Sequence, residues 1–295
     1  MSGYHQEKSD LLVARRTCRA RFVLVFVSLY TSNAIAQQSP ATDEHLKQAF
    51  HEVAVGYQIT EGIGRKLKQL PLRDEPIMHW LSLDSVKGAH VGSVFVWTRA
   101  QRPEVVGTIF SWDGAKTRME EFYSYSFDQL SVRSGSGKVW RPATNREMQR
   151  IPDAPIPAVS EQGRRLQIRS MSRGFSGRMN RLGEHHPLRL LPRPVYEYES
   201  DDPDISSGAL FILVAYTTDP DILLLIEARN TADGPKWFFQ PARFSDKSLW
   251  LTYKEKDIWT SLRKGHGTDQ PQPDDHQYHT EYVKFVAPRK SKNDE

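Results

Sequence analysis

The stretch Gly208–Arg229 reads GALFILVAYTTDPDILLLIEAR and decides the fold class of this 295-residue chain. Two runs of β-branched, aromatic and aliphatic residues, 208–216 and 222–229, flank a short polar segment that contains a proline. This pattern predicts two strands with a tight connection between them. Because a parallel crossover needs about a dozen residues or more, strands joined so closely are expected to run antiparallel.

The second run ends on two charged residues. Ile222–Ile226 is uninterrupted apolar sequence, as expected of a strand that is covered on both faces. Glu227 and Arg229 follow it two positions apart, so their side chains share one face of the strand. They either pair with each other or with a ligand, or they mark a strand end that emerges into solvent. We retain both as ligand-binding candidates.

Similar strand patterns lie on both sides of this hairpin. They cover 77–83, 92–97, 105–112, 118–125 and 129–132 in the first half, and 188–198, 237–244, 248–253 and 258–259 in the second. Segments with helical spacing of apolar residues, 39–70 and 160–178, precede the two sets. The sequence therefore predicts an α+β fold with mostly antiparallel sheet.

The two sets of strands follow landmarks in the same order: a proline, a glycine, a proline–acid turn, an Asp-Gly turn and a closing tryptophan. These fall at Pro76, Gly92, Pro103, Asp113 and Trp140, and again at Pro187, Gly208, Pro220, Asp233 and Trp259. Strands of about five or six residues would give any meander a similar rhythm. The matched order favours two related helix-plus-β-meander units, 37–141 and 159–262, with a proline-rich linker at 142–158 and a polar tail at 263–295.

Residues 1–36 carry the three parts of a secretory signal. Four arginines precede the apolar run Phe22–Tyr30, and Ala34–Ala36 supplies a small-x-small cleavage site. A bilayer span needs about 20 apolar residues, and this run is much shorter. We therefore expect a cleaved signal, a mature chain that begins at Gln37, a secreted or periplasmic location, and no membrane span after cleavage.

The composition of the predicted mature chain excludes some chemistry. Its sequence contains no cysteine, because Cys18 lies within the signal, so neither a disulfide nor a thiol is expected. The signal accounts for three of the four net positive charges, which leaves about +1 and gives no reason to expect nucleic acid as a partner. The second helical segment is nevertheless basic. Its Arg165 and Arg169 are candidates for binding an acidic polymer, unless they simply form a solvated face.

No pattern assigns a catalytic, cofactor-binding or metal-binding residue. His276 and His279 come closest to a metal site, in a polar stretch where a rigid site is hard to build. No Gly-x-Ser-x-Gly elbow marks a nucleophile. Glu120 and Glu121 are adjacent in a predicted strand and point to opposite faces, which prevents them from acting as a carboxylate pair. A triad assembled in space would leave no local pattern.

Three stretches carry a resemblance to a known group. VFVWTRAQRPEVVGTIF at 94–110, HPLRLLPRPVYEY at 186–198 and the 208–229 segment quoted above resemble a group of uncharacterised secreted proteins of planctomycete bacteria. The resemblance covers about 75–260 of the chain and implies export and a shared architecture. It implies no activity, cofactor or site residue.

From these observations we expect a non-catalytic binding or interaction protein of the cell envelope, of open oligomeric state. The alternative is a secreted hydrolase with a site assembled in space, and a third hypothesis is a purely structural envelope component. A deep polar pocket with two or more convergent titratable groups would favour the hydrolase. A flat or shallow aromatic surface would favour the binding protein.

Overall fold

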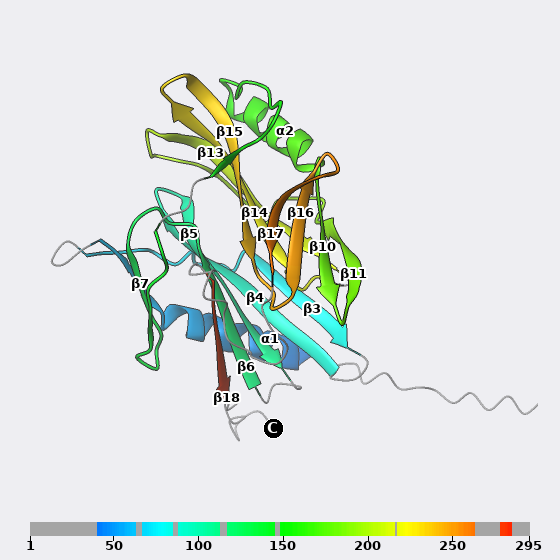
Figure 1. Cartoon of the computed structure of the whole chain (residues 1–295). Helices are drawn as coiled ribbons and strands as arrows, with labels where there is room; N and C mark the ends of the chain where they lie inside the picture. Colours follow the sequence, from blue (N-terminus) through cyan, green and yellow to red (C-terminus); the bar gives the residue numbers. More distant parts are fainter. Residues whose placement is uncertain are drawn as a thin grey trace, which may run out of the picture. The chain divides into compact units, whose positions relative to one another are not determined.

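The computed structural model describes residues 40–62, 67–84, 88–112, 117–144, 148–215, 217–262 and 278–284. These residues form two helices and three antiparallel sheets (Figure 1). All of them belong to one compact unit, Ser39–Glu295, which is distinct from residues 1–38. The predicted signal therefore lies outside the described residues.

The first sheet has five strands in the order β18-β6-β5-β4-β3. Its strands are β3 (Met78–Asp84), β4 (Gly88–Arg99), β5 (Arg102–Trp112), β6 (Thr117–Ser124) and β18 (Tyr278–Lys284). Strands β3 to β6 form a meander, as predicted, but the strand predicted at 129–132 as part of that meander belongs to a different sheet. Strand β18 comes from the stretch predicted to be a polar tail, and it pairs with β6 so that Tyr278 lies opposite Tyr123.

The second sheet has nine strands, in the order β17-β16-β10-β11-β13-β14-β15-β9, with β12 also paired to β13. They are β9 (Gln149–Arg150), β10 (Phe175–Arg181), β11 (Glu184–Leu190), β12 (Tyr196–Glu199), β13 (Ile205–Val214), β14 (Ile222–Thr231), β15 (Gly234–Arg243), β16 (Ser248–Tyr253) and β17 (Lys256–Ser261). The β13–β14 hairpin is the one predicted from Gly208–Arg229, and it pairs Leu213 with Ile222.

A third, smaller sheet has the order β2-β1-β7-β8. Its strands are β1 (Gln58–Glu61), β2 (Lys68–Gln69), β7 (Leu130–Arg133) and β8 (Val139–Trp140). It shares a core with the five-stranded sheet, because Ile59 and Val132 pack in the same cluster as Phe95 and Phe122.

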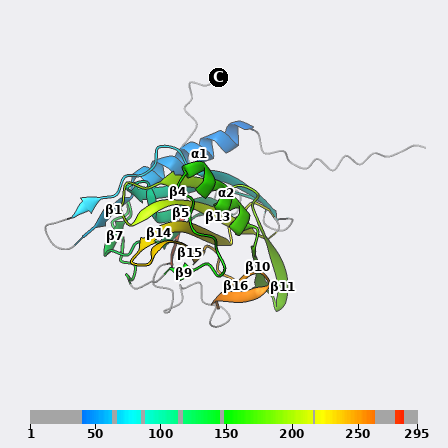
Figure 2. The ribbon, with the colours of Figure 1, turned by 90° about the horizontal axis from the view of Figure 1, so that it is seen from above.

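Each large sheet is covered by one helix (Figure 2). Helix α1 (Pro40–Val55) lies on β4 and β5 and buries Phe50 and Ala54 there. Helix α2 (Glu161–Ser172) lies on β13 and β14 and buries Ile168 and Met171. Both helices are shorter than the periodicity predicts. For α1 the reason is Gly56, which donates to the carbonyl oxygens of Glu52 and Val53 and closes the last turn.

The prediction of an α+β fold built from two related helix-plus-β-meander units is wrong. More than half of the described residues lie in strands, so the unit is mostly β. The two halves also differ in topology: β16 pairs back to β10, and β9 from the predicted linker joins β15. The shared spacing of prolines and glycines reflects only the rhythm of antiparallel turns.

The segment Gly208–Arg229 explains how the two large sheets and α2 are held together. In β14, Leu223 and Leu225 pack into a core shared by the two large sheets, while Ile222, Leu224 and Ile226 pack toward α2. The prediction that this strand is covered on both faces is therefore confirmed. Among the described helices, none is both long and apolar enough to cross a bilayer.

Candidate functional site

Glu227 lies in a buried ion network that joins the two large sheets. Arg102, at the start of β5, donates through Nε to Glu227 Oε1 at 2.7 Å, and through a terminal nitrogen to Glu104 Oε1 at 3.1 Å. The same nitrogen donates to the carbonyl oxygen of Tyr125 at 3.1 Å. Arg102 is 1% exposed and both carboxylates are fully buried. Burial alone would lower the pKa of Arg102, but Glu227 and Glu104 raise it above its ordinary value.

A tyrosine completes the buried end of the network. The Tyr198 hydroxyl donates to Glu227, and burial together with that carboxylate raises the pKa of Tyr198 well above its usual range. Gly208 lies opposite Tyr198 in the β12–β13 pair. A Cβ atom at position 208 would overlap the Tyr198 ring and hydroxyl, so glycine is needed for this close approach.

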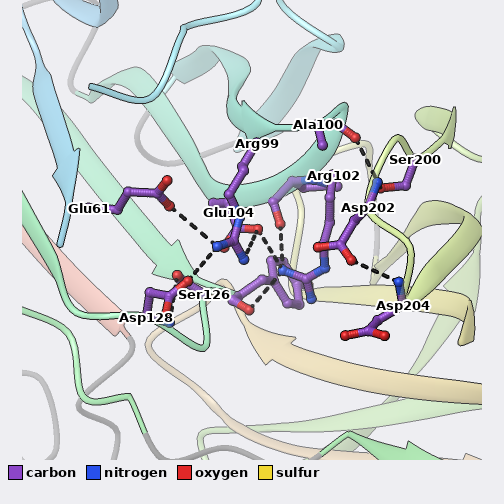
Figure 3. A network of polar contacts seen from close by, with 12 residues as sticks. Glu61, Arg99, Ala100, Arg102, Glu104, Ser126, Asp128, Ser200, Asp202 and Asp204 are labelled. Carbon is purple, nitrogen blue, oxygen red and sulfur yellow. Dashed lines mark hydrogen bonds and ion pairs between the residues drawn. The ribbon is translucent and has the colours of Figure 1, made fainter. Parts of the chain in front are cut away.

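Arg99 extends the network toward the surface (Figure 3). It pairs with Asp128 and with Glu104 at 3.3 Å, and it lies 3.7 Å from Glu61. Burial raises the pKa of Glu61, an effect that Arg99 opposes. Arginines and carboxylates therefore alternate from the surface to the centre of the network, and each neutralises its neighbours.

The two predicted candidates on β14 do share a face, but they pair with groups of the protein. Arg229 lies 3.8 Å from Glu227, and its guanidinium lies 4.7 Å from the centre of the Phe127 ring. The Arg102 guanidinium lies 4.8 Å from the same ring. Glu227 is inaccessible to solvent. Glu227, Arg102 and Arg229 therefore form a buried clamp, an ion network that links the two sheets, and do not form a ligand site.

The two candidates on α2 lie at the surface. Arg165 pairs with Glu161 one turn earlier at 2.5 Å, and Arg169 lies 3.2 Å from Glu197 of β12. About half of each arginine side chain is exposed. The structure therefore does not bring them together with Glu227 or Arg229 in one site.

A polar cavity of about 260 Å³ opens between the two large sheets, and we call it the inter-sheet cavity. It lies between β4 and β6 of one sheet and the β13–β14 and β15–β16 connections of the other. Its charged and polar lining consists of Ser82, His90, Glu121, Arg181, Thr217, Asp219, Asp221, Ser245, Asp246 and Lys247. Phe110, Met119, Met179 and Phe244 supply apolar wall.

Backbone hydrogen bonds fix the acidic side of the inter-sheet cavity. Asp221 Oδ2 accepts from the Ala215 amide at 2.9 Å, and the Phe244 amide donates to the Asp221 carbonyl oxygen at 2.9 Å. Thr218 ties the same connection to the other sheet, because its hydroxyl accepts from the Leu81 amide at 3.2 Å and donates to the Leu81 carbonyl oxygen. The two walls of the cavity are thus joined beside Asp219 and Asp221.

Carboxylates dominate the electrostatics of this cavity. Burial raises the pKa of Asp221 to about 7, against the opposing effect of the Ala215 amide and the Ser245 hydroxyl. Asp219 lies at the mouth with much of its surface exposed, and partial loss of hydration together with Asp221 and Glu121 raises its pKa. At neutral pH the cavity can therefore both hold a proton and attract a cation.

Glu120 and Glu121 lie on opposite faces of β6, as predicted. Glu121 lines the inter-sheet cavity. Glu120 points to the α1 side, where it accepts from the Tyr57 hydroxyl and pairs with Arg118 at 2.5 Å. Sequence reasoning missed Asp219 and Asp221, whose only local signal is the Asp-Pro-Asp segment 219–221, read there as a turn.

Other potential reaction centres are less suitable. Ser93 lies 2.8 Å from His79 Nδ1, but the Ser93 side chain is fully buried and therefore closed to solvent. Of the two histidines at the C-terminal end, only His279 lies within the described residues. Within all the residues that the structure describes, no group of three or more histidines and carboxylates is arranged to hold a metal ion.

A second hollow of about 530 Å³ lies beside α1, lined by residues that include Tyr57, Leu72 and Trp97. Two of its polar side chains already contact the protein: His51 Nε2 lies 3.0 Å from the Asp74 carbonyl oxygen, and the Arg73 guanidinium lies over the Tyr196 ring. The inter-sheet cavity therefore offers the stronger combination of concavity and titratable groups.

Comparison of the chain with protein-family models, curated proteins and solved structures finds no match.

Proposed function

We propose that the chain is an exported ligand-binding protein of the cell envelope whose ligand is a small molecule with a positive charge. The observation that carries the proposal is the inter-sheet cavity, which is lined by four carboxyl groups and by only two permanently charged cations, Arg181 and Lys247, of which Lys247 is paired with Asp246. Export is supported by the signal-like segment 1–36 and by the resemblance to secreted proteins. A volume of about 260 Å³ suits a ligand much smaller than a drug-sized molecule.

The lining also indicates what else the ligand contains. Phe110, Met119 and Phe244 offer an apolar wall beside the carboxylates, which suits a short hydrocarbon chain or ring attached to the cation. A bound cation would favour the ionised form of Asp221 and so lower the pKa of that carboxyl from about 7. Binding is therefore expected to release a proton and to tighten between pH 6 and pH 8.

Agmatine, a four-carbon chain with an amine and a guanidinium, is a suitable first probe. We expect millimolar agmatine to raise the melting temperature of the protein, because a ligand that binds only the folded state stabilises it. Asp219→Asn with Asp246→Asn is expected to weaken the affinity about tenfold or more, since about 1.4 kcal/mol corresponds to tenfold. Differential scanning fluorimetry and calorimetry measure both effects.

Two controls test whether the agmatine response depends on the charged side chains of the inter-sheet cavity. Asp233→Asn removes an acid that is 83% exposed at the β14–β15 turn, and it should leave the agmatine response unchanged. 1,4-Butanediol keeps the chain length without the charges and should give no shift. Equal responses to both compounds, or a full agmatine response in the double variant, would contradict the proposal.

A second candidate function, a secreted hydrolase, is favoured by the pKa of Asp221. A carboxyl with a pKa of about 7 holds a proton at neutral pH and can act as a general acid. The titratable groups that line this polar cavity also support this candidate. Ligand binding in this cavity is the step that both hypotheses share.

The hydrolase makes its own prediction. Turnover of methyl glycosides or alkyl esters, whose alkoxide leaving groups must gain a proton, should fall as the pH rises through about 7, because Asp221 then loses its proton. Asp221→Asn should lower the rate by about 100-fold or more, as expected for loss of a general acid. Wild-type rates equal to those of Asp221→Asn across pH 5–9 would exclude this mechanism and leave the binding proposal standing.

A further inference from the structure

Exposed aliphatic side chains gather at the start of α2. Val159 is 100% exposed, Ile156 78% and Leu166 62%. They are three of the eight large apolar side chains that are exposed in the described residues, and they lie within eleven positions of one another. Because burial of aliphatic side chains of this size is favourable, their common exposure calls for a reason.

Side chains of α2 hold this segment in its outward position. Gln167 donates to the Ile156 carbonyl oxygen at 2.9 Å and accepts from the Ala158 amide at 2.8 Å. Arg164 donates to the Val159 carbonyl oxygen at 2.7 Å and is itself tied to Ser207 of β13 at 3.0 Å. The backbone of Ile156–Val159 is therefore fixed to α2 and to the sheet, while its two aliphatic side chains face solvent.

Exposed arginines lie on the same side of α2 as Leu166. Leu166, Arg169 and Arg173 lie at i, i+3 and i+7, and so share the solvent side of α2. The carboxylates that face Arg165 and Arg169 are Glu161 and Glu197, and both pairs are exposed enough to contribute little to stability. Cations thus outnumber anions here, and the arginines can exchange these carboxylates for other anions.

We propose that this region docks on an anionic phospholipid membrane. The docking surface, called the α2 surface below, is formed by Ile156, Val159, Arg165, Leu166, Arg169 and Arg173. Aliphatic side chains beside cations are the combination that interfacial membrane contacts use. Protein hot spots instead favour tryptophan and tyrosine, and the α2 surface contains neither. The near-neutral net charge of the predicted mature chain gave no sign of this, because the positive charge is confined to one part of the surface. The proposal is independent of the inter-sheet cavity.

A site-specific label tests insertion directly. A chain that begins at Gln37 contains the whole compact unit and no native cysteine, so Val159→Cys can be labelled with the environment-sensitive dye NBD. Leu182→Cys is the matched control, because Leu182 is 97% exposed at the other end of β10 from α2. With vesicles of 30% phosphatidylglycerol in phosphatidylcholine, we expect a blue shift and about a twofold or larger rise in emission at position 159 only.

Variants then separate the apolar and charged parts of the surface. Ile156→Glu with Val159→Glu is expected to weaken vesicle co-sedimentation about 100-fold, and Arg165→Gln with Arg173→Gln about tenfold or more. The arginine effect should disappear with pure phosphatidylcholine vesicles. All four positions are exposed, and unchanged melting temperatures would confirm that the variants fold.

Three results would overturn the proposal. The first is absence of a spectral shift at position 159 with the phosphatidylglycerol vesicles. The second is an equal shift at position 182. The third is a dimer in analytical ultracentrifugation that Ile156→Glu with Val159→Glu dissociates, which would assign the α2 surface to a contact between proteins.

Discussion

Replacement of Arg102 by methionine is expected to lower the free energy of unfolding by about 3–5 kcal/mol. Arg102 donates four hydrogen bonds to Glu227, Glu104 and the Tyr125 carbonyl oxygen, and it is 1% exposed. Methionine fills much of the same volume but leaves two buried carboxylates without their main cation. Urea unfolding followed by circular dichroism and tryptophan fluorescence measures the loss.

Arg178→Met is the matched control. Arg178 also forms a two-pronged pair, with Asp257 at 2.7 and 2.8 Å, but its side chain is 33% exposed and that of Asp257 is 50% exposed. An exposed pair of this kind contributes about 1 kcal/mol or less. Similar losses at positions 102 and 178 would contradict the assignment of Arg102 as a buried clamp.

Removal of the partner charge should recover part of the stability. In Arg102→Met with Glu227→Gln, the glutamine oxygen can still accept from the Tyr198 hydroxyl, and the largest uncompensated charge is gone. Glu104 remains buried, so we expect recovery of about half the loss. Additive losses from the two substitutions would show that Arg102 and Glu227 do not act as a pair.

The local sequence pattern predicted those features of the fold that depend on residues close to one another in the chain. The uninterrupted run Ile222–Ile226 correctly indicated a strand covered on both faces, and the short polar segment after Val214 correctly indicated a hairpin. Helical spacing from Ser160 also gave α2, whose first turn is capped by the Ser160 hydroxyl. The predicted helical segment, 160–178, is longer than α2, however. Gly174 closes a turn onto Met171, and β10 follows.

Pairing between distant segments had no local signal. Strand β18 joins β6 across about 160 residues, and β9 and β16 join strands that no pattern linked to them. These pairings make the unit mostly β and remove the apparent repeat. Hydrophobic periodicity can indicate that a residue lies in a strand, but it carries no information about which strand lies beside it.

The buried ion network around Arg102 shows why the residues of the candidate site could not be predicted from the sequence either. Arg102 directly precedes the proline–acid turn predicted at Pro103, but the turn is at Ala100 and Gln101, both with positive φ, and β5 begins with Arg102 buried. Charged residues are read as exposed because isolated charges rarely enter a core. Arg102 enters because Glu227, 125 residues away, neutralises it. Asp219 and Asp221 were read as turn residues for the same reason.

Asp221 carries the second large expected effect, on the pH dependence of stability. Its pKa is about 7 in the folded protein against 3.8 when exposed, so the fold favours the protonated carboxyl. The resulting stabilisation is fully present below about pH 4 and is lost as the pH rises through about 7. One pKa unit corresponds to about 1.4 kcal/mol, which gives an upper limit of about 4 kcal/mol.

Asp221→Asn should remove this penalty, because an uncharged amide can still accept from the Ala215 amide without losing hydration as a charge. We expect the free energy of unfolding to rise by about 2–4 kcal/mol at pH 8 and to change little at pH 4.5. Urea unfolding at four pH values measures the difference. Asp219→Asn should have a smaller effect, because Asp219 is exposed, and Asp233→Asn should have none. If Asp221→Asn and wild type keep a constant difference from pH 4.5 to 8, the Asp221 carboxyl titrates as an ordinary exposed acid, and the cavity lacks the proton that the hydrolase mechanism requires.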